Sequence, residues 1–451
     1  MTALNRKSYQ KLLAWKTSKR RKPLLIRGAR QVGKTTLVRD FSKEFDNYIE
    51  LNLEKKADRA LFEIDDAGKI IDAVFLSKAH TPNNKPTLVF IDEIQESPKA
   101  IQQLRYFFEE VPELHIIAAG SLLEFALKQV PSFPVGRVEY LYLYPLNFVE
   151  YLDAIGNKSA IDALQTLPIQ EYSHKVLLEL FHQYAIIGGM PETVSNYVED
   201  KNISSLSNTY NQLWQSYKDD VEKYAKNNTD KKIIRHVIET APYAKDRIKF
   251  ERFGQSNYRS REVGEALHAL DLAKIIQLVY PSTSIRPPIT PDLKKRPRLQ
   301  FLDTGMLNQI LMLQAEMIAL PDLDDFHKGR IIQHLVVQEL TTINEDSALK
   351  YHFWVREEKN TNSEVDALIQ HKSYVIPIEV KAGKQGKLKS LHQFIDRCGH
   401  PYALRLYSGK FSIEEAKTPK GTPYYLMNLP YYLTTQIHQY LEYFTSTYKE
   451  V

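Results

Sequence analysis

The sequence predicts an α/β fold that begins with a parallel sheet flanked by helices and ends with a second α/β unit. Short, continuous apolar runs alternate with helical stretches between Pro23 and about Tyr151, and such runs are typical of strands buried on both faces. A long helical segment follows, and strands and helices are mixed again near the C-terminus. The expected buried strands are residues 24–26, 48–51, 88–91 and 115–119.

The length and composition indicate several packed units in a soluble protein. The chain has 451 residues, whereas a single hydrophobic core stops growing at roughly 250–300 residues, so we expect three or four units. Apolar residues make up 43% of the chain and charged residues 25%, which excludes disorder as the main state. The net charge of +5 is too small for a generally polybasic protein, although basic clusters occur at residues 19–22 and 294–296.

Membrane insertion and secretion are not expected. No apolar stretch reaches the roughly 18–20 residues that a membrane helix needs, and residues 1–22 are polar and basic. The single cysteine, Cys398, cannot form a disulfide within the chain and is expected to be a small buried side chain. These features predict a cytoplasmic protein.

The changes of pattern along the chain predict four domains. Residues 1–151 form the first sheet, and residues 152–245 form a helical subdomain broken at the turn 188–191, Gly-Gly-Met-Pro. Residues 246–321 combine a helix near 260–270, a strand near 274–280 and a basic, proline-rich loop, which indicates a winged helix. Residues 322–451 should contain a helix at 329–343, strands near 351–355, 364–370 and 374–382, and a helix at 388–396.

A phosphate-binding loop lies between the first strand and the following helix. It fits the pattern G-x-x-x-x-G-K-[ST], in which backbone N–H groups and the start of a helix surround phosphate oxygens. Lys34 should reach the β- and γ-phosphates of ATP, and Thr35 should bind Mg²⁺ through its hydroxyl. The expected nucleotide-binding residues here are Gly28, Ala29, Arg30, Gln31, Val32, Gly33, Lys34, Thr35 and Thr36.

Acidic residues follow the strand at 88–91. Asp92 and Glu93 stand at its carboxyl end, the edge where open α/β sheets bind ligands. We expect Asp92 to hold Mg²⁺ through water and Glu93 to act as the general base for the attacking water. On its own, an Asp-Glu pair would indicate the solvent-exposed end of a strand. The phosphate-binding loop upstream instead favours the roles in Mg²⁺ binding and catalysis.

Two further residues are candidates for the same site. Ser121 follows the strand at 115–119 and would stand near the γ-phosphate as a polar sensor, although it also suits a helix N-cap. Arg137 is a candidate for stabilising transition-state charge, from within the chain or from a neighbouring subunit, and a surface or ion-paired arginine is the alternative.

A second set of charged residues lies near the C-terminus. Asp366 precedes Glu379 and Lys381 by a distance that fits two strands of a hairpin, and alternation places Glu379 and Lys381 on one face. Acids that hold Mg²⁺ and a lysine beside the attacking water are what metal-assisted phosphodiester cleavage requires. Glu339, on the preceding helix, is the candidate for an additional acid. An edge strand with a solvated face is the alternative.

These motifs together resemble prokaryotic AAA-type ATPases that carry a C-terminal domain of unknown function with a restriction-endonuclease-like core. The resemblance spans nearly the whole chain and rests on residues 22–36, 90–95, 120–121, 144–148, 188–192, 302–305 and 364–366. It implies an ATPase core, a helical lid, a winged helix and a nuclease-like PD-(D/E)XK domain, in that order. Similar proteins carry a glutamate at the position of Gln333, so the resemblance implies an incomplete metal site here.

Three functional hypotheses follow. The first, which we favour, is an ATPase that acts on DNA, because two units associated with nucleic acids share the chain with an ATPase. The second is an ATP-gated regulatory switch in which the nuclease-like domain is an inactive scaffold. The third is an ATP-dependent, Mg²⁺-dependent nuclease. For each of them the expected cofactors are ATP and Mg²⁺, and we expect a homo-oligomer, with a ring among the arrangements that this class forms.

Overall fold

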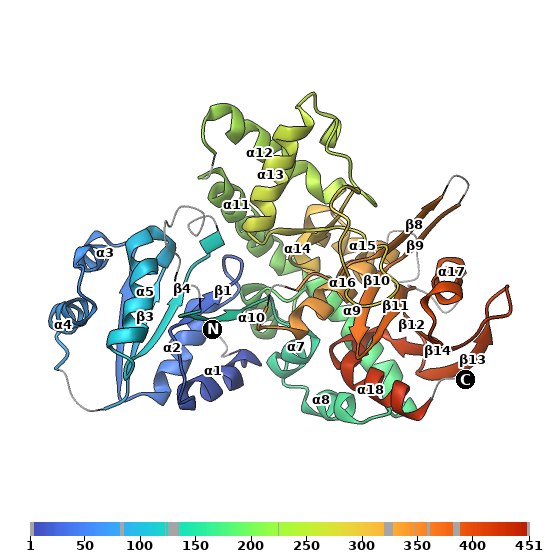
Figure 1. Ribbon diagram of the computed structural model, residues 1–451, viewed down its shortest axis with the longest axis horizontal. Helices are drawn as coiled ribbons and strands as arrows, with labels where there is room; N and C mark the ends of the chain where they lie inside the picture. The colour runs from blue at the N-terminus through green and yellow to red at the C-terminus, as the bar shows by residue number, and fades with distance from the viewer. Residues whose placement is uncertain are drawn as a thin grey trace.

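The computed structural model describes residues 4–81, 85–121, 123–124, 134, 136–223, 225–319, 328–347, 349–358, 361–381 and 388–448. One sheet lies at each end of the molecule, and helices α11 to α13 stand above the middle (Figure 1). The described residues include no helix that is long and apolar enough to cross a membrane. Cys398 is buried, and burial raises the pKa of its thiol to about 11.

The first sheet contains five parallel strands in the order β2-β3-β4-β1-β5. Its strands are β1 (Leu24–Arg27), β2 (Asn47–Asn52), β3 (Thr87–Asp92), β4 (His115–Ala119) and β5 (Glu139–Tyr142). Helices α1 (Ser8–Thr17) and α2 (Lys34–Phe41) cover one face, and α4 (Ala67–Ser77) and α5 (Pro98–Glu110) cover the other. Both faces are therefore buried, which confirms the expectation from the continuous apolar runs.

Helices dominate the middle of the chain. They are α7 (Phe148–Ala154), α8 (Lys158–Gln165), α9 (His174–Ile187), α10 (Pro191–Asp200), α11 (Ser207–Glu222), α12 (Asn228–Thr240) and α13 (Ser260–Leu272). The antiparallel strands β6 (Ile276–Val279) and β7 (Arg298–Phe301) follow, and then α14 (Thr304–Ile310) and α15 (Gln314–Ala319). A short helix, α3 (Lys56–Ala60), follows β2 in the first domain. Short 3-10 segments cover Ser42–Glu44, Leu61–Glu63, Ile94–Glu96, Glu171–Ser173, Ser204–Leu206, Ala241–Tyr243, Phe253–Gln255 and Tyr431–Gln436.

The C-terminal part contains a mixed sheet in the order β10-β11-β12-β14-β13. Its elements are α16 (Lys328–Ile343), β8 (Trp354–Glu358), β9 (Thr361–Val365), β10 (Ala367–His371), β11 (Tyr374–Val380), α17 (Lys389–Cys398), β12 (Tyr402–Tyr407), β13 (Ser412–Lys417), β14 (Pro423–Pro430) and α18 (Ile437–Thr447). The single strand expected at 364–370 is divided at Asp366, whose carboxylate accepts a hydrogen bond from the Val380 backbone. As a result β9 pairs with β8, and β10 pairs with β11.

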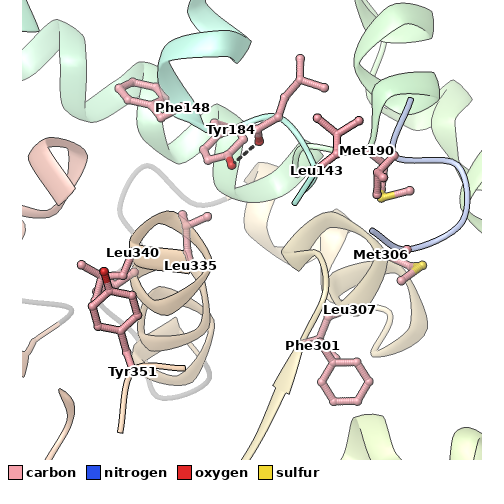
Figure 2. Packing of buried hydrophobic residues seen from close by; sticks show 14 of the residues in the cluster. Leu143, Phe148, Tyr184, Met190, Phe301, Met306, Leu307, Leu335, Leu340 and Tyr351 are labelled. Atoms are coloured by element: carbon pink, nitrogen blue, oxygen red, sulfur yellow. Dashed lines mark hydrogen bonds between the residues drawn. The ribbon is translucent and has the colours of Figure 1, made fainter. Parts of the chain in front are cut away.

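One hydrophobic core connects the first sheet to the C-terminal sheet. It passes through α9, α14 and α16, and Figure 2 shows Leu143, Tyr184, Met306 and Leu335 converging there. The expected Gly-Gly turn lies in this region, between the end of α9 and the start of α10. A Cβ added to Gly189 would lie 2.0 Å from the Leu146 carbonyl oxygen, so the turn sequence is required for the close packing of the backbones.

Candidate active site

The phosphate-binding loop leaves β1 and enters α2 at Lys34. Gly28 and Gly33 both have left-handed backbone angles, with φ values of 154° and 94°. A Cβ on Gly28 would lie 2.2 Å from the Leu143 carbonyl oxygen, so only glycine fits there. The loop therefore has the tight curve that directs backbone N–H groups inward, and α2 adds the positive end of its dipole.

Lys34 is buried and folds back onto the loop. Its ammonium donates hydrogen bonds to the Gly28 and Ala29 carbonyls, at 3.1 and 2.8 Å. Burial lowers the pKa of Lys34 to about 8, although the nearby charges of Glu93 and Asp92 oppose this shift. A negatively charged phosphate in the loop would favour the charged form of this lysine and compete with the two carbonyls for its protons.

Thr35 and Asp92 meet across the edge of the sheet. The Thr35 hydroxyl donates a hydrogen bond of 2.9 Å to Asp92 Oδ2. Burial raises the pKa of Asp92, and the Glu93 carboxylate contributes in the same direction, so a cation beside it would stabilise its charged form. A hydroxyl and a carboxylate oxygen at a phosphate loop are ligands that suit Mg²⁺. The residues present therefore fit this cofactor.

Glu93 lies beside Asp92 in a left-handed conformation, with φ of 52°. Its carboxylate accepts a hydrogen bond of 2.5 Å from the side-chain amide of Gln95. This amide lies over Gly120, where an added Cβ would be 2.2 Å from the Gln95 oxygen. Ser121 is buried just beyond Gly120, at the end of β4. Sequence reasoning did not assign a role to Gln95, because its contacts with Glu93 and Gly120 depend on side-chain packing that no local pattern encodes.

The second charged set also comes together. Asp366 immediately precedes β10, and Glu379 lies on the neighbouring strand β11, where Ile378 pairs with Ala367. Lys381 donates a hydrogen bond of 2.6 Å to Glu379. Burial raises the pKa of Glu379, and the charge of Asp366 adds to this effect. One oxygen of Glu379 is buried and has no hydrogen-bond partner among the described residues.

These residues do not fit a divalent cation well. Both oxygens of Asp366 already accept hydrogen bonds, one from the Gln333 amide and one from the Val380 backbone, each at 2.8 Å. The Arg298 guanidinium lies 3.8 Å from the same carboxylate. In the described part of the chain, no group of three or more His, Cys, Asp or Glu side chains is arranged to hold a metal ion.

Glu339 does not belong to this set, which corrects the expectation from the sequence. It lies six residues after Gln333 on α16, about 600° of helical rotation, and therefore points to another side. Its carboxyl group contacts the Tyr184 hydroxyl at 2.7 Å and the Phe148 backbone N–H at 3.1 Å, inside the central core. Burial raises the pKa of Glu339 to about 8.

Comparison with known proteins identifies the first domain. Residues 20–152 match the family of AAA domains. The first domain is therefore an AAA-type P-loop ATPase domain. Residues 178–317 and 328–427 match two domains of unknown function, DUF8612 and DUF4143. No curated protein matches the sequence of the chain.

Three solved structures resemble parts of the chain. A Walker-type ATPase of Pyrococcus abyssi is 15% identical, with a TM-score of 0.45, and the match covers 68% of this chain and 96% of that one. The ORC1 protein of Aeropyrum pernix, solved in complex with DNA, is 12% identical, with a TM-score of 0.31 and coverage of 70% and 94%. PCH-2 of C. elegans is 14% identical, with a TM-score of 0.24 and coverage of 43% and 60%.

The phosphate loop of the AAA domain is hydrogen-bonded directly to helix α11 of the helical segment. Arg30 donates two hydrogen bonds, of 2.7 and 2.8 Å, to the carboxylate of Asp220 on α11. Tyr217, one turn earlier on α11, donates to the Arg30 carbonyl at 2.7 Å. Arg6 donates to the Val32 carbonyl at 2.9 Å. Neither Arg6 nor Asp220 belongs to a sequence motif, so their contacts become visible only in the fold.

Arg137 of the AAA domain lies at the amino ends of the parallel strands, opposite the phosphate loop. It precedes β5, which is parallel to β1, so it stands at the end of the sheet where β1 begins rather than where the phosphate loop follows. Its guanidinium pairs with Glu109 at 2.9 Å and remains half exposed. Arg137 therefore lies away from the phosphate loop of its own chain.

Proposed function

We propose that the protein hydrolyses ATP and uses the nucleotide cycle to act on DNA. The observation that carries the ATPase assignment is the convergence of Lys34, the Thr35–Asp92 pair and Glu93 at the carboxyl edge of the parallel sheet. In this arrangement Lys34 exchanges its two carbonyl partners for phosphate oxygens. Thr35 and Asp92 hold Mg²⁺, which neutralises charge on the phosphates when bound.

Glu93 acts as the general base in this proposal. Its carboxylate lies next to Asp92 and is hydrogen-bonded to Gln95, so Gln95 positions the base before water attacks. Ser121 supplies a polar contact near the γ-phosphate. Arg137 acts on the site of a neighbouring subunit, because its own phosphate loop lies at the other edge of the sheet. The last role requires a homo-oligomer.

A basic groove supports the assignment to DNA. Helices α12 and α13 and the strands β6 and β7 form a helix-hairpin arrangement of the kind that winged helices use. A cavity of about 270 Å³ beside it is lined by basic residues, among them Lys249, Lys294 and Arg296. These three side chains are exposed and suit contacts with a phosphate backbone.

An acidic hairpin already neutralises part of this basic surface. Glu357 on β8 pairs with both Arg247 and Lys295, and Glu364 on β9 pairs with Arg298. These carboxylates would compete with DNA phosphates for Lys295 and Arg298. This observation favours a gated version of the function, in which hairpin β8–β9 must move before the whole basic surface binds.

Nuclease activity is not part of the proposal. Asp366 has both oxygens engaged by N–H donors, and Gln333 offers its amide hydrogen to Asp366 rather than a carboxylate to a cation. We therefore propose that the nuclease-like fold serves as a scaffold for binding.

The rate of ATP hydrolysis with and without DNA tests this proposal. We expect the purified protein to hydrolyse ATP, and duplex, single-stranded or branched DNA to raise the rate. Lys34→Ala should abolish both rates, and Lys175→Ala, at an exposed site on α9, is the matched control. Hydrolysis that no form of DNA changes, together with no DNA binding at low salt, would favour the regulatory switch instead.

A further inference from the structure

A cavity of about 320 Å³ lies between β7, α16 and the segment before β8. Arg330, Gln333 and Val337 line it from one face of α16, at the spacing of successive helical turns. Arg298 and Leu299 line it from β7. Its volume is near the lower end of the roughly 300–1,000 Å³ that small-molecule sites occupy. The cavity is separate from the phosphate loop of the AAA domain.

Arg330 is a half-buried cation without a carboxylate partner among the described residues. Within the described part of the chain its guanidinium donates one hydrogen bond, to the Pro242 carbonyl at 3.0 Å, whereas the group has five N–H donors. Burial lowers the pKa of Arg330, and only the nearby Asp246 opposes this effect. A bound anion would satisfy the remaining donors and repay the desolvation of the charge.

Lys245 and Arg298 also line this cavity, but Arg298 is already paired with Glu364 and lies 3.8 Å from Asp366, so Lys245 is the cation that adds positive charge. Arg298 lies over the Phe353 ring, 4.3 Å from its centre, which fixes the plane of the guanidinium. Lys245 is exposed at the rim. Of the two carboxylates in the lining, Asp366 is already engaged by Gln333 and the Val380 backbone, and Asp246 is exposed. Guanidinium groups bind phosphate oxygens in pairs, so this charge pattern suits a phosphate.

Most of the remaining lining is apolar, apart from Gln300 and His334, which are hydrogen-bonded to each other. Val279, Leu299, Val337, Tyr351 and Phe353 form walls that suit the flat, weakly hydrated part of a ligand. We propose that the cavity binds a phosphate group together with one attached nucleoside, either as a free mononucleotide or as the phosphorylated end of a nucleic acid strand. Arg330 holds the phosphate, Lys245 adds positive charge at the rim, and the apolar walls receive the nucleoside. This inference does not depend on the ATPase assignment.

Calorimetric titration of the full-length Lys34→Ala protein tests this proposal, because that substitution weakens the other nucleotide site. The probes are inorganic phosphate, AMP, and one oligonucleotide with and without a 5′-phosphate. We expect Arg330→Gln to weaken binding at least tenfold, and Arg105→Gln, an exposed arginine on α5, to leave it unchanged. Stronger binding of the 5′-phosphorylated strand than of its unphosphorylated counterpart identifies a strand end, and equal binding of the two strands with binding of AMP identifies a free nucleotide.

Absence of binding by all of the probes, or equal binding by the parent and the Arg330→Gln protein, would overturn the proposal. The thermal midpoint of each variant shows whether it is folded. If Arg330→Gln fails to fold, Lys245→Gln decides the matter, because Lys245 is exposed and its loss leaves the core intact. Lys245→Gln should weaken phosphate binding severalfold, and unchanged binding would refute the site.

Discussion

Replacing Glu339 by glutamine should make the protein more stable than the wild type at pH 7, and this difference should be larger at pH 9. The reason lies in the hydrogen bonds of Tyr184, whose hydroxyl is 2.7 Å from both Glu339 Oε1 and the Leu146 carbonyl oxygen. One hydroxyl proton cannot serve both acceptors. A protonated Glu339 resolves this, because it donates to Tyr184, which then donates to Leu146.

The magnitude follows from the pKa of this group. Burial raises the pKa of Glu339 from 4.5 to about 8, so between these values the folded protein holds a proton that the unfolded chain has lost. Stability therefore falls with rising pH and stops falling above about pH 8. Between pH 7 and pH 9 the loss corresponds to about one pH unit of titration, or roughly 1 kcal/mol. Glutamine keeps both hydrogen bonds and removes the ionisation.

Urea unfolding at pH 7 and pH 9 measures this difference. The free energy of unfolding of the wild type should fall by roughly 1 kcal/mol more than that of Glu339→Gln over this interval. Glu179→Gln, at an exposed site on α9, is the control and should follow the wild type. Parallel pH dependence of the wild type and Glu339→Gln would refute the protonated carboxyl group and the assignment of Glu339 to the core network.

Three other outcomes are expected. Glu357→Gln should strengthen DNA binding, because Arg247 and Lys295 become available to phosphates. The slope of log affinity against log salt concentration should become steeper by about one to two. An unchanged slope in a salt titration would contradict the proposed gating. The wild type should not cleave DNA in Mg²⁺, and cleavage that Asp366→Ala abolishes would show that the metal site is complete. Gly189→Ala should lower the free energy of unfolding by about 1–3 kcal/mol or more, because the new Cβ would overlap a backbone carbonyl. Gly329→Ala is the control and should not lower it, because a Cβ there meets no described atom within 4 Å. Equal melting temperatures of the two variants would contradict the tight turn.

Much of the first domain could be predicted because its signals are local. The apolar runs locate the strands, and parallel strands place their carboxyl ends at one edge, so Lys34, Thr35, Asp92 and Glu93 had to be neighbours if the sheet formed. The same reasoning brought Asp366 near Glu379 through the pairing of β10 and β11. In both cases the spacing along the chain and the geometry of the sheet were sufficient.

Other features depend on contacts between distant segments, which no local pattern encodes. Helical rotation already separates Glu339 from Gln333, but only the packing around α16 decides that Gln333 meets Asp366 while Glu339 meets Tyr184. The tie between Arg30 and Asp220 joins residues that are 190 positions apart. The shared core between the two sheets was missed for the same reason, since composition suggests separate units wherever the pattern changes.

ATP binding and ATP hydrolysis by Glu93→Gln test the central claim most directly. The substitution keeps the shape of the side chain and removes only the base, so the affinity for ATP should remain close to that of the wild type. Steady-state hydrolysis should fall by at least about 100-fold, the usual contribution of a general base. Hydrolysis by Glu93→Gln at the rate of the wild type would contradict the assignment of Glu93 as the catalytic base of this AAA domain.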